Sequence, residues 1–164
     1  MTNFYFTSDH HFNHKRVIEF GHRPFSTLSE METVLISNWN QTVKPSDTVF
    51  IVGDFNFLGT SNTFVLMNKL NGFKVFISGN HDKQQFLDSC IVNMLGKQFE
   101  VIHNPDYSSY MNVIHGHVHL PSAVKIHRQK NGRLFINVNV ELWDYKPVSV
   151  KTLSKLINKF NKSK

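Results

Sequence analysis

The sequence is poor in cysteine, and this scarcity excludes several classes of protein. Its single cysteine, Cys90, rules out an intramolecular disulfide framework and any zinc cluster built on thiolates. No apolar run approaches the roughly 18 residues that a membrane-spanning helix needs. The first residues, MTNFYFTSDHHFNHKR, are polar and acidic where a signal peptide would be apolar. We therefore expect a protein of a reducing cytoplasm that has no membrane partner.

Acidic residues are missing from the end of the chain, where none follows Asp144. The last 14 residues instead contain five lysines, namely Lys151, Lys155, Lys159, Lys162 and Lys164. They account for most of the net charge of +6, because the rest of the chain holds 13 basic and 12 acidic residues. The simplest interpretation is a solvated lysine face on a final helix. The alternative is an electrostatic patch for a polyanion such as nucleic acid.

Histidine and phenylalanine are abundant, with 10 and 15 residues among 164. Hydrophobic residues make up 40% of the chain and charged residues 18%, so we expect a packed core in one domain spanning residues 1–164. Because histidine is a common ligand of transition metals, clustered histidines favour a metal site over a purely structural role.

The hydrophobic pattern predicts an α/β domain. Strands are expected at Asn3–Ser8, Thr48–Val52, Phe73–Ser78 and Asn112–His115, and helices at Ser29–Gln41, Ser61–Leu70 and Val150–Phe160. Two hairpins are expected, Cys90–Leu95 with Gln98–His103 and Ala123–Gln129 with Arg133–Val140. Ser29 and Asp82 are candidate helix caps, the latter for a short helix through Leu87. An alternation of strands and helices followed by paired strands indicates mixed sheets.

Several predicted strands end in metal-binding residue types. The clusters are Asp9-His10-His11, Gly53-Asp54, Gly79-Asn80-His81, His103 and His117-Val118-His119. Open α/β folds build their sites at the carboxyl ends of strands, so we expect these clusters to converge. Oxygen and imidazole donors without thiolate suit Mn, Fe or Zn. Each short motif is weak alone, but seven donors exceed one tetrahedral zinc and fit two metals that share a carboxylate.

The order of these clusters resembles that of the calcineurin-like metallophosphoesterases. That family has D-x-H, G-D, G-N-H-[DE], a single His and G-H-x-H in sequence, and this chain matches from residue 9 to residue 119. Ser8–His14 and Asn137–Leu142 further resemble a small bacterial and bacteriophage branch of phosphoesterases. The resemblance implies a sandwich of two packed mixed β-sheets flanked by α-helices, in a bacterial or phage-infected host cytoplasm.

The same resemblance implies the roles of individual residues. The first metal would be bound by Asp9, His11, Asp54 and His119, and the second by Asp54, Asn80, His103 and His117, with Asp54 as the bridge. The two divalent ions would be Mn²⁺, with Fe, Zn or Ni as alternatives. His81 would contact the phosphate as an acid, and His115 would be either a supporting or a substrate-facing group.

The expected chemistry is hydrolysis of a phosphoric ester by in-line attack of a hydroxide that bridges the metals. Asp54 and His81 are the catalytic candidates, since His81 can stabilise the phosphoryl oxygens or protonate the leaving oxygen. His14, His22 and Arg23 follow the first ligands on a loop and are candidates for the substrate side. For His22 and Arg23, ordinary polarity of an exposed loop is the alternative.

Departures from the family narrow the substrate. The Asp-Arg-Gly that follows Gly-Asp in the protein Ser/Thr phosphatases is missing after Gly53-Asp54. At 164 residues we also expect no cap domain like that of the repair nucleases. These features favour a cyclic nucleotide or another small phosphodiester. The alternatives are a nuclease acting on DNA or RNA through the lysine-rich helix, and a non-catalytic metal-binding interaction scaffold. The oligomeric state is left open.

Overall fold

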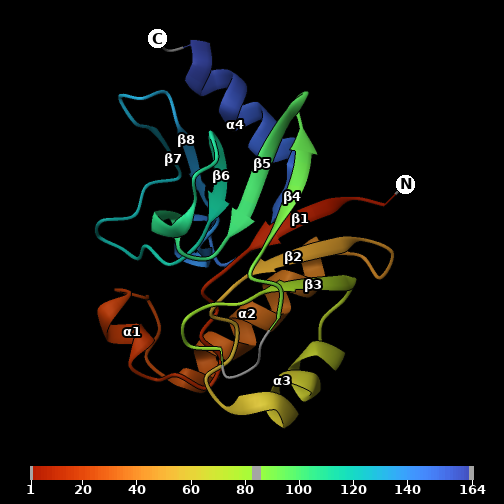
Figure 1. The fold of residues 1–164 in the computed structure, drawn as a ribbon. Coiled ribbons are helices and arrows are strands. Elements are labelled where there is room, and N and C mark those ends of the chain that lie inside the picture. The colour runs from red at the N-terminus through yellow and green to blue at the C-terminus, as the bar shows by residue number, and fades with distance from the viewer. Residues whose placement is uncertain (1, 83–85, 163–164) are drawn as a thin grey trace.

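Two mixed β-sheets pack face to face in the computed structural model, which describes residues 2–82 and 86–162 (Figure 1). The first sheet has the order β3-β2-β1-β9 and comprises β1 (Phe4–Thr7), β2 (Thr48–Val52), β3 (Phe73–Ile77) and β9 (Val148–Ser149). The strands β1, β2 and β3 are parallel, and β9 is antiparallel to β1. The parallel strands therefore direct their carboxyl ends to the same edge.

The second sheet has the order β4-β5-β6-β8-β7. Its strands are β4 (Ser89–Met94), β5 (Lys97–Ile102), β6 (Asn112–His115), β7 (Ile126–Arg128) and β8 (Leu134–Asn137). The strands β5, β6 and β8 are parallel, whereas β4 and β7 pair with their neighbours in antiparallel hairpins. Both predicted hairpins are therefore confirmed. The strands of the first are shifted by one residue, and those of the second are shorter than expected.

The helices are α1 (Val17–Phe20), α2 (Leu28–Thr42), α3 (Gly59–Asn68) and α4 (Val150–Lys162), with short 3-10 turns at η1 (Pro105–Tyr107) and η2 (Val140–Leu142). Alternation along the first sheet places apolar side chains on both of its faces. On β2, Val49 and Ile51 pack with Trp39 of α2, whereas Val52 belongs to the cluster between the sheets. The first sheet is thus covered by helices on one side and by the second sheet on the other.

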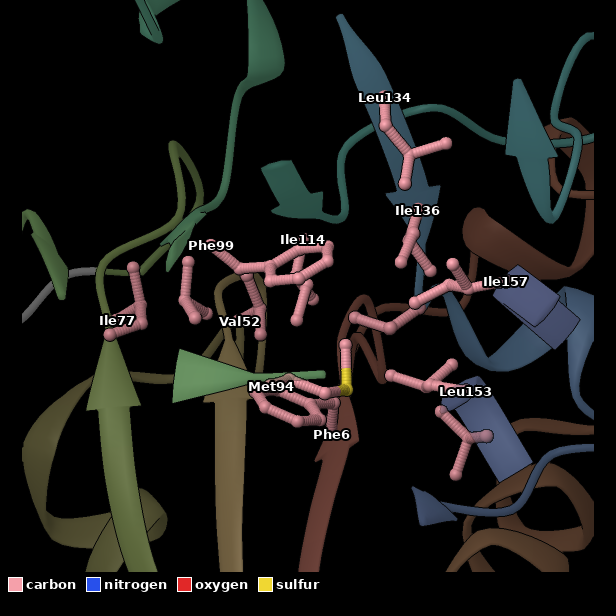
Figure 2. Packing of buried hydrophobic residues seen from close by; sticks show 13 residues of the cluster. Phe6, Val52, Ile77, Met94, Phe99, Ile114, Leu134, Ile136, Leu153 and Ile157 are labelled. Atoms are coloured by element: carbon pink, nitrogen blue, oxygen red, sulfur yellow. The ribbon is translucent and has the colours of Figure 1, made fainter. Parts of the chain in front are cut away.

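The cluster between the sheets also includes α4 (Figure 2). Phe6, Val52 and Ile77 of the first sheet meet Phe99 and Ile114 of the second. Two buried residues of α4, Leu153 and Ile157, pack against this cluster from the C-terminal end of the chain. The predicted fold class, two packed mixed sheets flanked by helices, is confirmed.

Several predicted boundaries were wrong. The helix α2 begins at Leu28, because the side chain of Thr27, not Ser29, accepts the N–H of Glu30 and caps it. The short helix expected from Asp82 to Leu87 falls largely on residues 83–85, which lie outside the described residues. The short elements α1 and β9 carry too few residues to show a period and were not anticipated. Among the described residues, no helix combines the length and apolar content required to cross a membrane.

Candidate metal centre

Loops that follow five strands bring all seven predicted ligands to one end of the sandwich. The loops after β1, β2 and β3 carry Asp9 with His11, Asp54 and Asn80, and those after β5 and β6 carry His103 and the pair His117 and His119. Each strand thus ends one to four residues before a ligand. The convergence expected from the strand-end pattern is what the structure shows.

The first group of donor atoms joins Asp9, His11 and His119. One donor atom of each lies within 4.8 Å of the others. Nε2 of His119 is 3.5 Å from Oδ1 of Asp9, and Nε2 of His11 is 3.5 Å from Oδ2 of Asp54. Asp54 therefore borders this group as the resemblance implies.

The second group centres on His103. Its Nε2 lies 3.4 Å from Oδ2 of Asp54 and 3.1 Å from Oδ1 of Asn80. The Asn80 oxygen is also 3.0 Å from Nδ1 of His117. The donor atoms of Asp9, Asp54 and His103 lie within 4.8 Å of one another as well, so the two groups are contiguous. Oδ2 of Asp54 faces a histidine of each group, which suits a shared ligand.

The backbone around these ligands is held in unusual conformations. Four ligands have left-handed φ values between 52° and 70°, namely Asp9, His11, Asp54 and His117. Such conformations cost free energy for residues other than glycine and cluster at functional sites. Gly53 also has a left-handed φ of 80°, and a Cβ there would collide with the ring of His103. The absence of a side chain at Gly53 therefore allows the His103 ring to approach the backbone closely, as expected for a glycine at this position after a strand.

Asp82 organises two of the ligand loops. Its carboxylate accepts the backbone N–H groups of Asp54, Phe55 and Gly79, each at 2.9 Å. These contacts join the loop after β2 to the loop after β3. Within the described residues, Asp82 therefore holds these two loops together, while the helix that it was expected to cap includes residues 83–85, outside the described residues.

Electrostatics keep Asp54 ionised and His11 neutral. Burial by itself raises the pKa of Asp54, but the hydrogen bond and charge of His103 and the proximity of His11 outweigh it and lower that pKa well below its usual range. Burial is the largest influence on His11 and lowers its pKa to about 2. A carboxylate and an unprotonated imidazole are the forms that bind metal. Burial lowers the pKa of His103, but its hydrogen bond to Asp54 outweighs this and raises that pKa to about 9, so a metal ion bound to His103 would have to displace a proton.

The donor set fits divalent transition metals. It consists of carboxylate and amide oxygens and imidazole nitrogens, without thiolate. Nε2 of His11 is buried and has no hydrogen-bond partner among the described residues. A buried polar atom without a partner is costly, and a metal ion at this position would satisfy it. These acidic and histidine groups are therefore able to bind metal.

His81 and His14 border the centre from the solvent side. The backbone N–H of His81 donates to Oδ1 of Asp54 at 2.9 Å, while its ring is exposed and lies 5.5 Å from the ring of His11. The ring of His14 is half-buried, stacks on Phe57 at 4.3 Å and is 6.0 Å from that of His81. Both rings are placed where a bound ester could meet them.

The expectation that Arg23 lines the substrate side was wrong. Arg23 is only 4% exposed, and its guanidinium lies behind the first ligand loop. It donates to the backbone oxygens of Asp9 and His10, at 2.5 and 2.9 Å, and to Oε1 of Glu141 at 3.0 Å. Every nitrogen of the guanidinium is therefore occupied by the protein itself. Sequence reasoning failed because Glu141 is 118 positions away.

A substrate-facing role for His115 was also wrong. His115 is 2% exposed within β6, and its Nδ1 contacts the backbone oxygen of Gly116 at 2.8 Å. Its ring meets the edge of Phe135 on the neighbouring strand β8. Burial lowers the pKa of His115 to about 4, so the ring is neutral at physiological pH. The alternation of His115 with His117 and His119 suggested a shared position at the site, but His115 still lies within the strand.

Two further residues contact ligands and escaped the sequence reasoning. Oγ of Ser8 donates to Oδ2 of Asp9 at 2.5 Å, and Oε1 of Glu141 is 2.7 Å from Nδ1 of His119. The signal for both was present, because Ser8 and Glu141 lie in the two segments that carry the resemblance to the small phosphoesterase branch.

An open cavity of about 610 Å³ adjoins the second group of ligands. Asn80, His103 and His117 line it on the side of the metal centre, and Asp88 and Tyr107 also contribute to its walls. Tyr107 is 82% exposed. The volume lies within the range of pockets that accept small organic ligands.

Comparisons with known proteins include a relative that spans almost the whole chain. No protein-family model matches the sequence. The uncharacterized protein MJ1445 of Methanocaldococcus jannaschii is 40% identical over 97% of this chain and 93% of its own length. The gene 66 protein of Mycobacterium phage L5 is 34% identical over 50% of this chain and 41% of its own length.

A solved structure shares the fold. The crystal structure of AQ665 from Aquifex aeolicus, titled a protein of unknown function, aligns with a TM-score of 0.73 and 26% identity over 95% of this chain and 100% of that one. The match with MJ1445 is long enough and similar enough in sequence to show that the two proteins share a family. This chain belongs to the same protein family as MJ1445 of Methanocaldococcus jannaschii.

Proposed function

We propose that the protein is a metal-dependent phosphodiesterase that hydrolyses a cyclic nucleotide or another small phosphodiester. The observation that carries the proposal is the convergence of seven oxygen and imidazole donors, from five strand ends, into two contiguous groups. The order of these donors along the chain resembles that of the calcineurin-like metallophosphoesterases, and assignment to the small bacterial and phage branch is part of the proposal.

The residues fit two divalent cations, for which Mn²⁺ is our first choice and Fe, Zn or Ni are the alternatives. One ion would be held by Asp9, His11, Asp54 and His119, and the other by Asp54, Asn80, His103 and His117. A bound pair of such ions activates water and neutralises charge on the phosphoryl oxygens.

The remaining residues supply positioning and proton transfer. The hydrogen bond from the His81 backbone fixes the Asp54 carboxylate, so Oδ2 points between His11 and His103. The His81 ring, exposed beside His11, is placed to hold a phosphoryl oxygen or to donate a proton to the leaving oxygen. His14, backed by Phe57, forms the adjacent wall.

The substrate class follows from the space around the centre. The cavity of about 610 Å³ beside Asn80, His103 and His117 accommodates a nucleotide-sized group. Peptide recognition has no support, because the Asp-Arg-Gly of the protein phosphatases is missing after Gly53-Asp54. A small diester therefore fits better than a phosphoprotein.

A screen of substrates tests the proposal. Protein stripped with chelator and reloaded with Mn²⁺ is assayed on bis-nitrophenyl phosphate, a nitrophenyl phosphomonoester, cyclic nucleotides, single-stranded DNA and RNA, and a phosphoserine peptide. We expect the highest kcat/KM on a small phosphodiester, with activity absent from the stripped protein. Clear preference for the phosphopeptide would overturn the assignment.

The same screen separates the two alternatives. The lysines of α4 are exposed on the side opposite the buried Leu153 and Ile157. A nuclease that uses this face would prefer nucleic acid, and Lys155→Gln combined with Lys162→Gln would lower activity on nucleic acid alone. A scaffold would bind two ions and hydrolyse none of the substrates.

A further inference from the structure

Glu141 has a buried carboxylate at the edge of the metal centre and is not one of the proposed ligands. Its side chain is fully inaccessible to solvent and lies in η2, within the segment Asn137–Leu142 that the resemblance singled out. The backbone N–H of Glu141 donates to Oδ1 of Asn139 at 3.0 Å, which fixes the turn. A buried carboxylate is stable only when its charge and its oxygens are paired, so the groups that contact Glu141 indicate its role.

One partner is the proposed ligand His119. Oε1 of Glu141 is 2.7 Å from Nδ1 of His119, and Oε2 accepts the backbone N–H of Leu120 at 3.1 Å. A carboxylate only accepts hydrogen bonds, so Nδ1 must carry the proton. With that proton in place, Nδ1 cannot accept from Nδ2 of Asn139, which lies 3.3 Å away and donates to the backbone oxygen of Val118. In the neutral form of this ring the opposite nitrogen, Nε2, has the lone pair, and it faces Oδ1 of Asp9 at 3.5 Å.

The other partner is the buried Arg23. Its Nε donates to the same Oε1 of Glu141, at 3.0 Å, and its two terminal nitrogens donate to the backbone oxygens of Asp9 and His10. The Arg23 and Glu141 side chains are both fully buried, so each compensates the charge of the other. One guanidinium thus joins the turn that carries Glu141 to the loop that carries Asp9.

The backbone of Gly21 packs closely against the Glu141 carboxylate. Gly21 lies next to it, and a Cβ on Gly21 would fall 2.5 Å from Oε1. The chain at the end of α1 therefore approaches the carboxylate so closely that only glycine fits there.

We propose that Glu141 and Arg23 are positioning residues of the first metal site. Glu141 fixes the ring of His119 with Nε2 toward the metal, and Arg23 holds Glu141 and the Asp9 loop in register. The inference rests on the proposed function, because it presupposes that Asp9, His11 and His119 bind an ion. Hydrogen bonds of this kind orient metal-binding histidines and raise their basicity.

Metal titration of the whole protein tests the proposal without an assay of activity. Glu141→Gln keeps the size of the side chain, but it replaces one of the two accepting oxygens with an NH₂ group that only donates. We expect the affinity for one of two Mn²⁺ equivalents to fall roughly 10–100-fold, with the other unchanged. The matched control is Glu100→Gln, since Glu100 is also buried and accepts a hydrogen bond, from Ser108. Glu100→Gln should bind both equivalents like the original protein.

A second measurement needs no variant of Glu141 and decides the matter if that variant fails to fold. In Zn²⁺-loaded protein, long-range ¹H–¹⁵N spectra report which nitrogen of each histidine carries the proton, and His119→Gln assigns the signal. We expect protonated Nδ1 and metal-bound Nε2 on His119. The reverse protonation pattern would overturn the inference, and so would a folded Glu141→Gln protein that binds both Mn²⁺ equivalents as tightly as the original protein. In either case, the binding of two ions would leave the proposed function standing. Protein that binds no metal would overturn both.

Discussion

Substitution of His81 separates catalysis from metal binding. The His81 ring is exposed beside the centre, and only its backbone N–H contacts a ligand, at 2.9 Å from Oδ1 of Asp54. His81→Ala retains that backbone contact, so both metals and the fold should remain. A positioned acid–base group contributes roughly 10²–10⁴-fold in rate. This corresponds to about 2.7–5.4 kcal/mol of transition-state stabilisation at about 1.36 kcal/mol per tenfold.

The leaving group shows which role His81 has. A nitrophenolate is a weak base that departs without a proton, whereas an alkoxide requires one. If His81 donates that proton, the loss of kcat in His81→Ala should be much smaller for a nitrophenyl diester than for an alkyl diester. An equal loss on both would indicate that His81 acts on the phosphoryl oxygens instead. The assay is kcat and KM with Mn²⁺ in excess, accompanied by metal analysis of each protein.

Asp54→Ala should behave in the opposite way. Oδ2 of Asp54 lies 3.5 Å from Nε2 of His11 and 3.4 Å from that of His103, so its removal takes a donor from both groups. Metal content and rate should fall together. The control is Asp144→Asn, because Asp144 is an exposed acid with a left-handed φ of 53°, which asparagine tolerates. The division between ligand and catalyst is refuted if His81→Ala empties a metal site while Asp54→Ala leaves both filled.

Three further predictions concern stability. Mn²⁺ at 100 times its dissociation constant should stabilise the protein by about 2.7 kcal/mol per site, seen as a rise in Tm that Asp54→Ala lacks. Asp82→Ala removes the acceptor of four backbone N–H groups, three of them at 2.9 Å and the fourth at 3.4 Å. It should lower the free energy of unfolding, measured in urea, by about 3–6 kcal/mol. This is less than the sum for the three shorter charged hydrogen bonds taken separately, because water reaches the freed N–H groups. Asp82→Asn should lower the free energy of unfolding by less. Hydrogen bonds from the backbone of Lys44 and Asn3 lower the pKa of Asp47. Its stabilisation is therefore present above about pH 3.9 and is lost as the pH falls through the lower folded pKa. A stability difference from Asp47→Asn that persists unchanged at more acidic pH would contradict this assignment.

The sequence sufficed for features that depend on local pattern. Apolar runs at Thr48–Val52 and Asn112–His115 gave strands, and a ligand follows each at its carboxyl end. Their convergence was predictable because parallel strands share an edge. Boundaries depended on capping, and the side chain of Thr27 supplied the cap that Ser29 was expected to supply. Metal-ligand types at strand ends were therefore a more reliable guide than helix limits.

Burial decided what the sequence left undetermined. Arg23 and His115 have the same polarity as groups that bind substrate, yet the former is neutralised by Glu141 and the latter lies inside a sheet. Neither partner is near in sequence, so no local pattern distinguishes a buried arginine from an exposed one. Glu141 was hidden for the same reason, because its importance comes from contact with His119, 22 residues earlier.

The division of the proposed ligands between the sheets has a consequence for how the molecule assembles. Asp9, His11, Asp54 and Asn80 follow strands of the first sheet, whereas His103, His117 and His119 follow strands of the second. Each proposed ion would therefore crosslink the sheets at one edge. During synthesis, neither set of donors is complete before the residues after β6 have left the ribosome. If the proposed ions bind, they would therefore join the sheets only after the strands up to β6 have been made, and their removal by chelator would weaken the contact between the sheets at this edge first.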